Sequence, residues 1–394
     1  MNAKIAIIIE RADISLGGAE RSIFELRAAL TALGYSVDIL AAKGRTDAKN
    51  IYILCRDNSG KRVNFFTFED AIKKHLSENK YDIIHSVLPF DFADVYQPRG
   101  GTYAETIIRN AASYQNKFLE YYKRITAVTN SRRTTLLRTE RKISQSLDGP
   151  LIAALSEYVA DQFKRHYNTD ARRIVVIPNG VKTDKRINST AADTLRSHIL
   201  AKLRLKEADN PVFFLFVANN FRLKGLIPLI QAIRIATRKK SERQAYLIVA
   251  GHGKEKKYRR LKDNSAAKNI LFLGSLSHIQ NALSIIDVAV LPTFYDPSSR
   301  FILEALAANK PVITTRFNGA TDLFTHNRHG IIINTPENIE ALAEAINYFT
   351  DTDNIQKASQ AIIEDNLWEE ISIDRAAKQL QNVYESILQR KDLK

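Results

Sequence analysis

The 394-residue sequence contains a single cysteine, Cys55, so no disulfide can form within the chain and no cysteine-rich metal site is possible. It also lacks any apolar run of the roughly 18 to 20 residues that a membrane-spanning helix needs. The apolar run Ile5–Ile9 is ended by Glu10 and is too short for the core of a signal peptide. These absences predict a protein of the cytoplasm, either soluble or attached to the inner face of the cytoplasmic membrane.

Acidic residues are too few to balance the basic ones: 43 Asp and Glu against 58 Lys and Arg give a net charge of +15. Such a positive field attracts polyanions and anionic membrane surfaces. The cations are concentrated in residues 109–142, where nine Lys or Arg accompany only Glu120 and Glu140. This basic region is either a solvated helix face or a surface that binds an anionic membrane or acceptor. No nucleic-acid-binding module accompanies the charge, so we expect no nucleic acid partner.

Short apolar runs alternate with amphipathic helical patterns in two successive sets. Runs that are apolar at nearly every position are typical of strands covered on both faces, as in parallel sheets. The pattern predicts an α/β protein with two Rossmann-like, doubly wound domains, residues 1–178 and 179–368, followed by a last helix at about 369–394. The predicted strands are 4–9, 37–40, 51–54, 82–84, 151–155 and 174–177 in the first half, and 212–218, 246–250, 270–273, 288–291, 312–314 and 330–333 in the second.

Ligands of such sheets bind at the carboxyl ends of the strands, and candidate motifs follow several predicted strands. Gly17 and Gly18 precede a helix, where small residues let a ligand approach the backbone and the helix start favours negative charge. Arg222 and Lys224 lie two residues apart in the loop after strand 212–218, an arrangement that suits a diphosphate. Each pattern alone is also compatible with an ordinary turn or with solvated surface cations.

The most specific motif follows strand 288–291. Asp296 lies at the strand end, Ser298 or Ser299 is expected to cap the next helix, and Glu304 lies about two turns into that helix. The free amides at the helix start can hold phosphate or sugar oxygens. Glu304 can then accept hydrogen bonds from two ribose hydroxyls, and Asp296 from sugar hydroxyls. The alternatives are a helix-capping aspartate and an ordinary surface glutamate.

The segment Leu291–Asp322 resembles the donor-site signature of glycosyltransferase family 4, whose members are retaining enzymes of the GT-B fold. Within the family the chain is most similar to lipopolysaccharide core glucosyltransferases. The other motifs that fall in the order of the family are Gly17-Gly18, Pro178-Asn179-Gly180-Val181, Arg222 with Lys224-Gly225, and Val249-Ala250-Gly251-His252-Gly253, joined in the first domain by Asp94-Val95-Tyr96 and Tyr103-Ala104-Glu105. The family resemblance also implies that the last helix packs back on the first domain.

This resemblance implies a role for each motif in binding the donor. Glu304 would hold the ribose and Asp296 the transferred sugar, while Arg222 and Lys224 would neutralise the diphosphate leaving group in place of a metal ion, so that no metal or other cofactor is needed. The remaining implied contacts are the Gly18 amide at the diphosphate, Gly274 and Ser275 beside the nucleobase, and His252 in a turn on the base side.

The acceptor side departs from the family pattern. Where many relatives have a histidine or an aspartate, the segment Tyr96–Gly101 has neither. His85, Asp94 and Arg99 are the candidates near it, although a histidine in the position of His85 is more often a structural residue at a strand end. The sequence assigns no catalytic base.

Taken together, the sequence predicts a retaining hexosyltransferase that uses a nucleotide diphosphate sugar, most simply a UDP-sugar. The expected acceptor is a cell-envelope glycolipid or a lipopolysaccharide core oligosaccharide, reached at an anionic membrane through residues 109–142. The alternative is a catalytically inactive subunit that binds nucleotide sugars or assists assembly in a glycan pathway. Donor hydrolysis without acceptor distinguishes the two.

Overall fold

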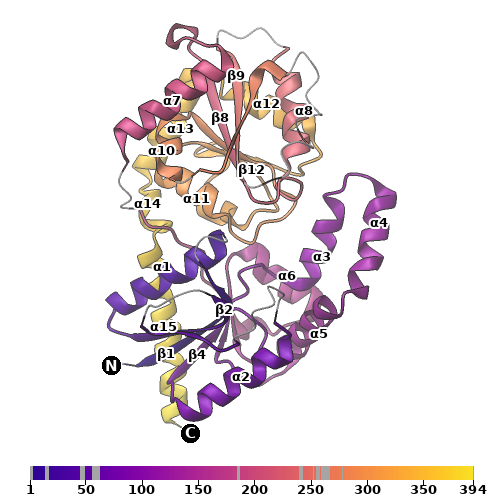
Figure 1. The fold of residues 1–394 in the computed structure, drawn as a ribbon, viewed down its shortest axis with the longest axis vertical. Helices are drawn as coiled ribbons and strands as arrows, with labels where there is room; N and C mark the ends of the chain where they lie inside the picture. Colours follow the sequence, from indigo (N-terminus) through magenta and orange to yellow (C-terminus); the bar gives the residue numbers. More distant parts are fainter. Residues whose placement is uncertain are drawn as a thin grey trace. The chain divides into compact units, whose positions relative to one another are not determined.

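The computed structural model describes residues 3–13, 17–44, 49–55, 63–183, 187–238, 243–251, 253, 258, 267–276 and 278–393. His252 lies outside these residues. The chain forms two compact units: the first comprises residues 1–111, 117–181 and 372–394, and the second comprises residues 112–116 and 182–371. Each is an α/β unit built on one parallel sheet (Figure 1), which confirms the predicted fold class.

The first unit contains a seven-stranded parallel sheet of order β3-β2-β1-β4-β5-β6-β7. Its order reverses direction between β1 and β4, the switch point beside which ligands of such sheets bind. The predicted strands are all present, whereas β5 was missed because two residues give no periodic signal. The strands are β1 (Lys4–Ala12), β2 (Ser36–Gly44), β3 (Ile51–Ile53), β4 (Ile83–Ser86), β5 (Val95–Tyr96), β6 (Leu151–Ala154) and β7 (Ile174–Val176).

All helices of the first unit except α4 pack around this sheet, and the last helix of the chain is one of them (Figure 1). Helix α15 places Ile373, Ala377 and Tyr384 in the same buried cluster as the side chains of β1 and β2. Gly34, with φ of 95°, follows the end of α1, as a left-handed C-terminal residue should. The helices are α1 (Gly18–Ala32), α2 (Phe65–Glu78), α3 (Tyr103–Ala112), α4 (Lys117–Thr126), α5 (Ser131–Gln145), α6 (Glu157–Tyr167) and α15 (Ile373–Asp392).

The second unit contains a six-stranded parallel sheet of order β10-β9-β8-β11-β12-β13. Its central strands β8, β9 and β11 are apolar and almost completely buried, which explains why their sequence runs predicted them well. The strands are β8 (Val212–Val217), β9 (Ala245–Ala250), β10 (Ile270–Gly274), β11 (Val288–Leu291), β12 (Val312–Thr315) and β13 (Gly330–Ile333).

The helices of the second unit follow these strands in turn. Trp368 lies on α14 and is about half exposed. The helices are α7 (Ser189–Leu203), α8 (Leu226–Ala236), α10 (Ile279–Ile285), α11 (Arg300–Ala307), α12 (Ile339–Tyr348), α13 (Thr352–Glu364) and α14 (Leu367–Glu370), and a 3-10 turn, η6, spans Gly319–Leu323.

The basic region 109–142 corresponds to the end of α3, α4 and α5. Three of its cations are in ion pairs with acids: Arg109 with Glu105, Arg132 with Glu10, and Lys142 with Asp91. Helix α4 buries none of its residues and lies away from the sheet of its unit (Figure 1). Among the helices of the described part of the chain, none is both long and apolar enough to cross a membrane.

A buried carboxylate, Glu140 on α5, joins three elements of the first unit. It accepts hydrogen bonds from the Tyr96 hydroxyl at 2.7 Å, the Tyr167 hydroxyl at 2.5 Å and the Tyr103 amide at 2.7 Å. Burial raises the pKa of Glu140 to about 7, although the three donors act in the opposite direction. The folded protein therefore binds this proton more tightly than the unfolded chain does.

Glu140 should make the first unit less stable as the pH rises. Because the pKa of Glu140 is higher in the folded state, its proton stabilises the folded protein fully below the unfolded pKa of about 4.3. This stabilisation decreases as the pH rises and is lost above about pH 7. Relative to Glu140→Gln, the free energy of unfolding of the wild type should fall by about 3 kcal/mol between pH 4 and pH 8. Urea titrations across this range measure the difference, with the exposed Glu157→Gln as control. Parallel pH profiles of wild type and Glu140→Gln would contradict the assignment.

Candidate functional site

The donor-side candidates of the second unit gather where β8 and β11 end. The loop after β8 and the loop after β11 are joined by backbone hydrogen bonds, since the Phe294 amide donates to the Leu223 carbonyl at 2.9 Å. Lys224 lies in the first loop and Asp296 in the second. Nζ of Lys224 stands 2.6 Å from Oδ2 of Asp296 and donates to the Tyr295 carbonyl at 2.9 Å. The structure thus brings together two of the predicted residues in one ion pair.

Gly225 makes this approach of the two loops possible. It caps α8 with φ of 81°, a left-handed conformation that glycine adopts without strain. A Cβ at this position would overlap the carbonyl oxygen of Pro292 in the second loop. The sequence Lys224-Gly225 is therefore one structural unit, in which the glycine lets the lysine reach Asp296.

The side chain of Asn318, which is completely buried, fixes the loop before α11 by hydrogen bonds. Its side-chain Oδ1 accepts from the amides of Ser299 and Ala320, both at 3.1 Å, and its Nδ2 donates to the Thr314 hydroxyl at 3.0 Å. Ser299 occupies the N-cap position of α11, but its side chain makes no capping hydrogen bond. Ser299 thus lies at the expected cap position without the expected side-chain hydrogen bond, while the amides of Ser298 and Ser299 donate to Asp296 and to Asn318.

Glu304 is not the ordinary surface acid that the alternative interpretation supposed. It is buried on α11 and pairs with Arg300 one turn earlier, Nη2 to Oε1 being 3.3 Å. It lines a small cavity of about 80 Å³ whose other walls come from the chain before α7, from α10 and from the end of α11. The carboxylate is thus held at the edge of a space that a ligand can enter.

Arg222 has a different environment from Lys224. Its guanidinium lies 3.8 Å from the centre of the Tyr114 ring and hydrogen-bonds the Ser113 hydroxyl. Burial lowers its pKa from the usual value of 12.5, but the group stays a cation at neutral pH. Residues 113 and 114 belong to the short segment 112–116 of the second unit, which sequence reasoning did not connect with Arg222.

The glycine candidates lie at strand ends in both units. Gly274 ends β10 with φ of 73° and has open space where a Cβ would point, and the exposed Ser275 follows it. Gly17 and Gly18 stand at the start of α1, after β1 of the first unit, and Gly18 is exposed. Their backbones are therefore accessible to a ligand.

Two of the acceptor-side candidates of the first unit, His85 and Arg99, interact electrostatically, whereas Asp94 lies elsewhere. His85 at the end of β4 is fully buried, and its Nδ1 lies 2.5 Å from the Tyr384 hydroxyl of α15. Burial, together with the charge of Arg99, lowers the pKa of His85 to about 3, so it is neutral. This favours the structural role for His85. Arg99, after β5, donates from Nη1 to Oδ1 of Asn179 at 3.1 Å, in the loop after β7.

Asp94 does not belong with these two residues. It precedes β5 and so lies at the amino end of the strand, opposite to the edge at which ligands bind. Its carboxylate accepts from the Ile84 amide at 2.8 Å and pairs with Lys391 at 2.7 Å. The expectation that Asp94 lies on the acceptor side is therefore corrected: Asp94 connects α15 to the amino-terminal end of strand β5.

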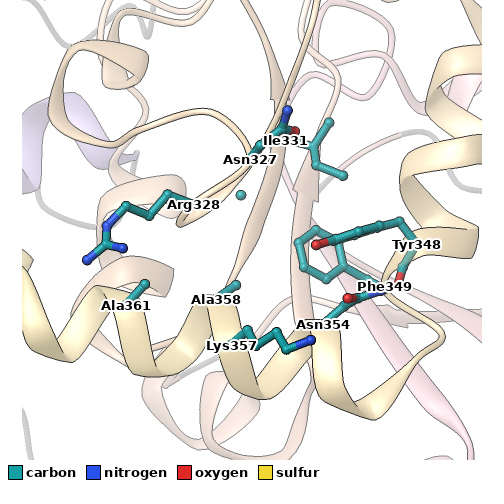
Figure 2. A pocket seen from close by; sticks show the side chains of 10 residues that line it. Asn327, Arg328, Ile331, Tyr348, Phe349, Asn354, Lys357, Ala358 and Ala361 are labelled. Atoms are coloured by element: carbon teal, nitrogen blue, oxygen red, sulfur yellow. Dashed lines mark hydrogen bonds between the residues drawn. The ribbon is translucent and has the colours of Figure 1, made fainter.

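Two larger cavities among the described residues are lined by none of the predicted donor-side or acceptor-side residues. One of about 250 Å³ lies between β13 and α13 of the second unit, where Tyr348, Arg328 and Lys357 line its walls (Figure 2). Another of about 270 Å³ lies between the first turns of α2 and α5 in the first unit. Within the described residues, no three His, Cys, Asp or Glu side chains are grouped as they would be to hold a metal ion.

Two family models match the chain, one in each half. The model of Glycosyltransferase Family 4 matches residues 16–185, and that of glycosyl transferases group 1 matches residues 201–365. The lipopolysaccharide glucosyltransferase WaaG of Escherichia coli K12 is 22% identical over 338 residues, which cover 84% of this chain and 85% of WaaG. An α-1,3-galactosyltransferase of Escherichia coli that acts on GlcNAc-diphosphoundecaprenol with UDP-Gal is 27% identical over 185 residues, 46% of each chain.

Solved structures match the fold over almost the whole chain. The crystal structure of WaaG has a TM-score of 0.75 at 18% identity and covers 96% of this chain and 99% of its own. HepE of Anabaena, crystallised with UDP-glucose, has a TM-score of 0.67 at 16% identity and covers 98% of this chain and 100% of its own. The architecture is that of the GT-B fold.

Gly225→Ala should destabilise the second unit, because it adds both a strained φ and a collision with the Pro292 carbonyl. We expect a loss of about 3 kcal/mol or more, against about 1 kcal/mol for Gly274→Ala, where φ is equally unfavourable but the space is open. Thermal unfolding followed by circular dichroism compares the two variants. Equal melting temperatures would show that the loops can separate without loss.

Proposed function

Since this chain belongs to glycosyltransferase family 4 and is a glycosyltransferase of glycan biosynthesis, we propose that it transfers a hexose from a UDP-sugar with retention of the anomeric configuration. The acceptor in this proposal is a cell-envelope glycolipid or a lipopolysaccharide core. The observation that carries the proposal is the ion pair between Lys224 and Asp296 where β8 and β11 end, beside the first amides of α11.

Lys224 is placed to stabilise the leaving group. In the transfer, the bond between the anomeric carbon and the diphosphate oxygen breaks as the acceptor oxygen attacks from the same face. The acceptor proton passes to the departing diphosphate. Charge therefore develops on the diphosphate, where a preorganised cation stabilises the transition state most. Asp296 holds the Lys224 ammonium in place and also accepts hydrogen bonds from the transferred sugar.

The proposal includes further donor contacts in the second unit. Arg222 adds a second positive charge at the diphosphate. Glu304 accepts the ribose hydroxyls, and the Gly274-Ser275 turn lies beside the nucleobase. Because the cationic side chains supply the positive charge at the leaving group, the proposed transfer needs no divalent metal.

Helix α4 supports the proposed attachment to an anionic membrane. Phe118, Tyr121, Tyr122 and Ile125 recur at helical spacing along one face, and each is between 50% and 77% exposed. Three cations lie on the same helix: Lys117, Lys123 and Arg124. An exposed apolar stripe with flanking cations is typical of helices that lie in the interface of an anionic bilayer. A soluble helix face alone would not need the apolar stripe.

Lys224→Ala should reduce turnover by about 10²-fold or more, on the scale of losing one preorganised charge partner. UDP release from UDP-glucose, with or without added glycolipid acceptor, measures the rate. Lys357→Ala, an exposed lysine in the cavity of Figure 2, is the matched control and should leave the rate unchanged.

Chelation by EDTA should likewise leave the rate of the wild type unchanged. A Lys224→Ala rate within twofold of wild type would reject the leaving-group role. Inhibition by EDTA that manganese reverses would reject the metal-free proposal. Absence of any UDP release by the wild type would favour an inactive binding subunit.

The double variant Phe118→Ser, Ile125→Ser should bind anionic vesicles about 10-fold or more weakly, since burial of two large apolar side chains is lost. Flotation with vesicles of phosphatidylglycerol and phosphatidylethanolamine measures binding, and vesicles of phosphatidylcholine alone should bind less than the anionic ones. Leu147→Ser, at an equally exposed leucine after α5, is the control. Equal binding of the double variant and the control would place the membrane contact elsewhere.

A further inference from the structure

Arg300 is a buried cation in the first turn of α11, and neither the family signature nor the sequence pattern gave it a role. Only 9% of the residue is exposed, and 8% of Glu304, its partner. The two residues are four positions apart and therefore lie on the same side of the helix. Nη2 of Arg300 stands 3.3 Å from Oε1 of Glu304.

Burial of this pair is costly and so points to a purpose other than stability. An exposed pair of this spacing contributes only a few tenths of a kcal/mol to a helix, whereas two buried charges lose their hydration. Arg300 compensates the buried carboxylate, and its planar guanidinium is a rigid partner that restricts where Glu304 can point. The pair therefore fixes the orientation of one carboxylate.

That carboxylate stands at the wall of the cavity of about 80 Å³. The opposite walls come from Lys182 and Thr183 ahead of α7 and from Gln280 and Leu283 on α10. The cavity is therefore large enough to hold several water molecules. The hydroxyl groups of a ligand can thus reach Glu304 from this side, while Arg300 holds the carboxylate from within the helix.

We propose that Arg300 is a positioning residue that fixes Glu304 to accept the ribose hydroxyls of the donor. The inference rests on the proposed function, in which Glu304 binds the ribose. A carboxylate that is already oriented loses little freedom when the nucleotide binds, so the hydrogen bonds that it accepts contribute fully to affinity. Arg300 acts on the ribose through Glu304 and does not act on the diphosphate.

The test compares UDP with 2′-deoxy-UDP by isothermal titration calorimetry. The wild type should bind UDP about 10- to 100-fold more tightly, the effect of one hydrogen bond to a charged acceptor. Arg300→Met should bind UDP only as tightly as 2′-deoxy-UDP, and the affinity for 2′-deoxy-UDP should differ little between Arg300→Met and the wild type. Inorganic diphosphate should bind both proteins equally. Arg300→Lys, which keeps the charge without the planar fork, should restore part of the discrimination.

A double-mutant cycle with Glu304→Gln separates positioning from a structural role. If Arg300 acts through Glu304, adding Arg300→Met to Glu304→Gln causes no further loss of UDP affinity. The double variant also leaves no buried charge unpaired, so it carries the test even where Arg300→Met alone does not fold.

Two results would overturn the inference. In one, Arg300→Met keeps the wild-type ratio between the affinities for UDP and 2′-deoxy-UDP. In the other, Arg300→Met lowers the affinity for inorganic diphosphate as much as that for UDP. Failure of the wild type to bind UDP at all would instead overturn the proposed function.

Discussion

The contact between Lys224 and Asp296 holds together the carboxyl ends of strands β8 and β11 in the second unit. It connects the loops that follow two strands, and it can form only because Gly225 lets the backbone of one loop lie against Pro292 of the other. Asn318 then fixes the second loop from the interior by accepting the amide that opens α11. A cation, a carboxylate and the start of a helix are thereby held together before any substrate arrives. Preorganisation of this kind is what makes an electrostatic site effective.

The fold could be read largely from the sequence because parallel strands covered on both faces leave continuous apolar runs. Val212–Val217 and Val288–Leu291 are examples: the first is buried except at Val217, and the second is buried throughout. The two-residue strand β5 gave no such signal. Asp94 was misplaced for the same reason, because the edge of the sheet on which it lies depends on where β5 begins.

The candidate site was only partly accessible to sequence reasoning. Spacing along the sequence predicted two pairs of site residues: Asp296 with Glu304, and Arg222 with Lys224. The partners that fix these residues come from elsewhere: Tyr114 lies against Arg222, and Asn318 holds the loop of Asp296. Buried networks such as that of Glu140 likewise join residues whose proximity follows only from tertiary packing. Arg300 was visible at the right helical spacing, yet an arginine four residues from a glutamate is common on solvated helices and signals nothing until its burial is known.

Helix α15 has a consequence for how the protein is made. Its side chains complete the core of the first unit, but it follows the whole second unit in the chain, about 190 residues after the first unit's last strand. At the usual rate of translation, ~5–20 residues per second, these residues take roughly 10–40 s to emerge. During that interval the apolar side chains of the first unit that pack against Ile373, Ala377 and Leu380 in the folded protein are exposed to solvent. The order of synthesis therefore leaves the first unit incomplete while the second can already fold, so assembly of the nascent chain is expected to finish from its far end.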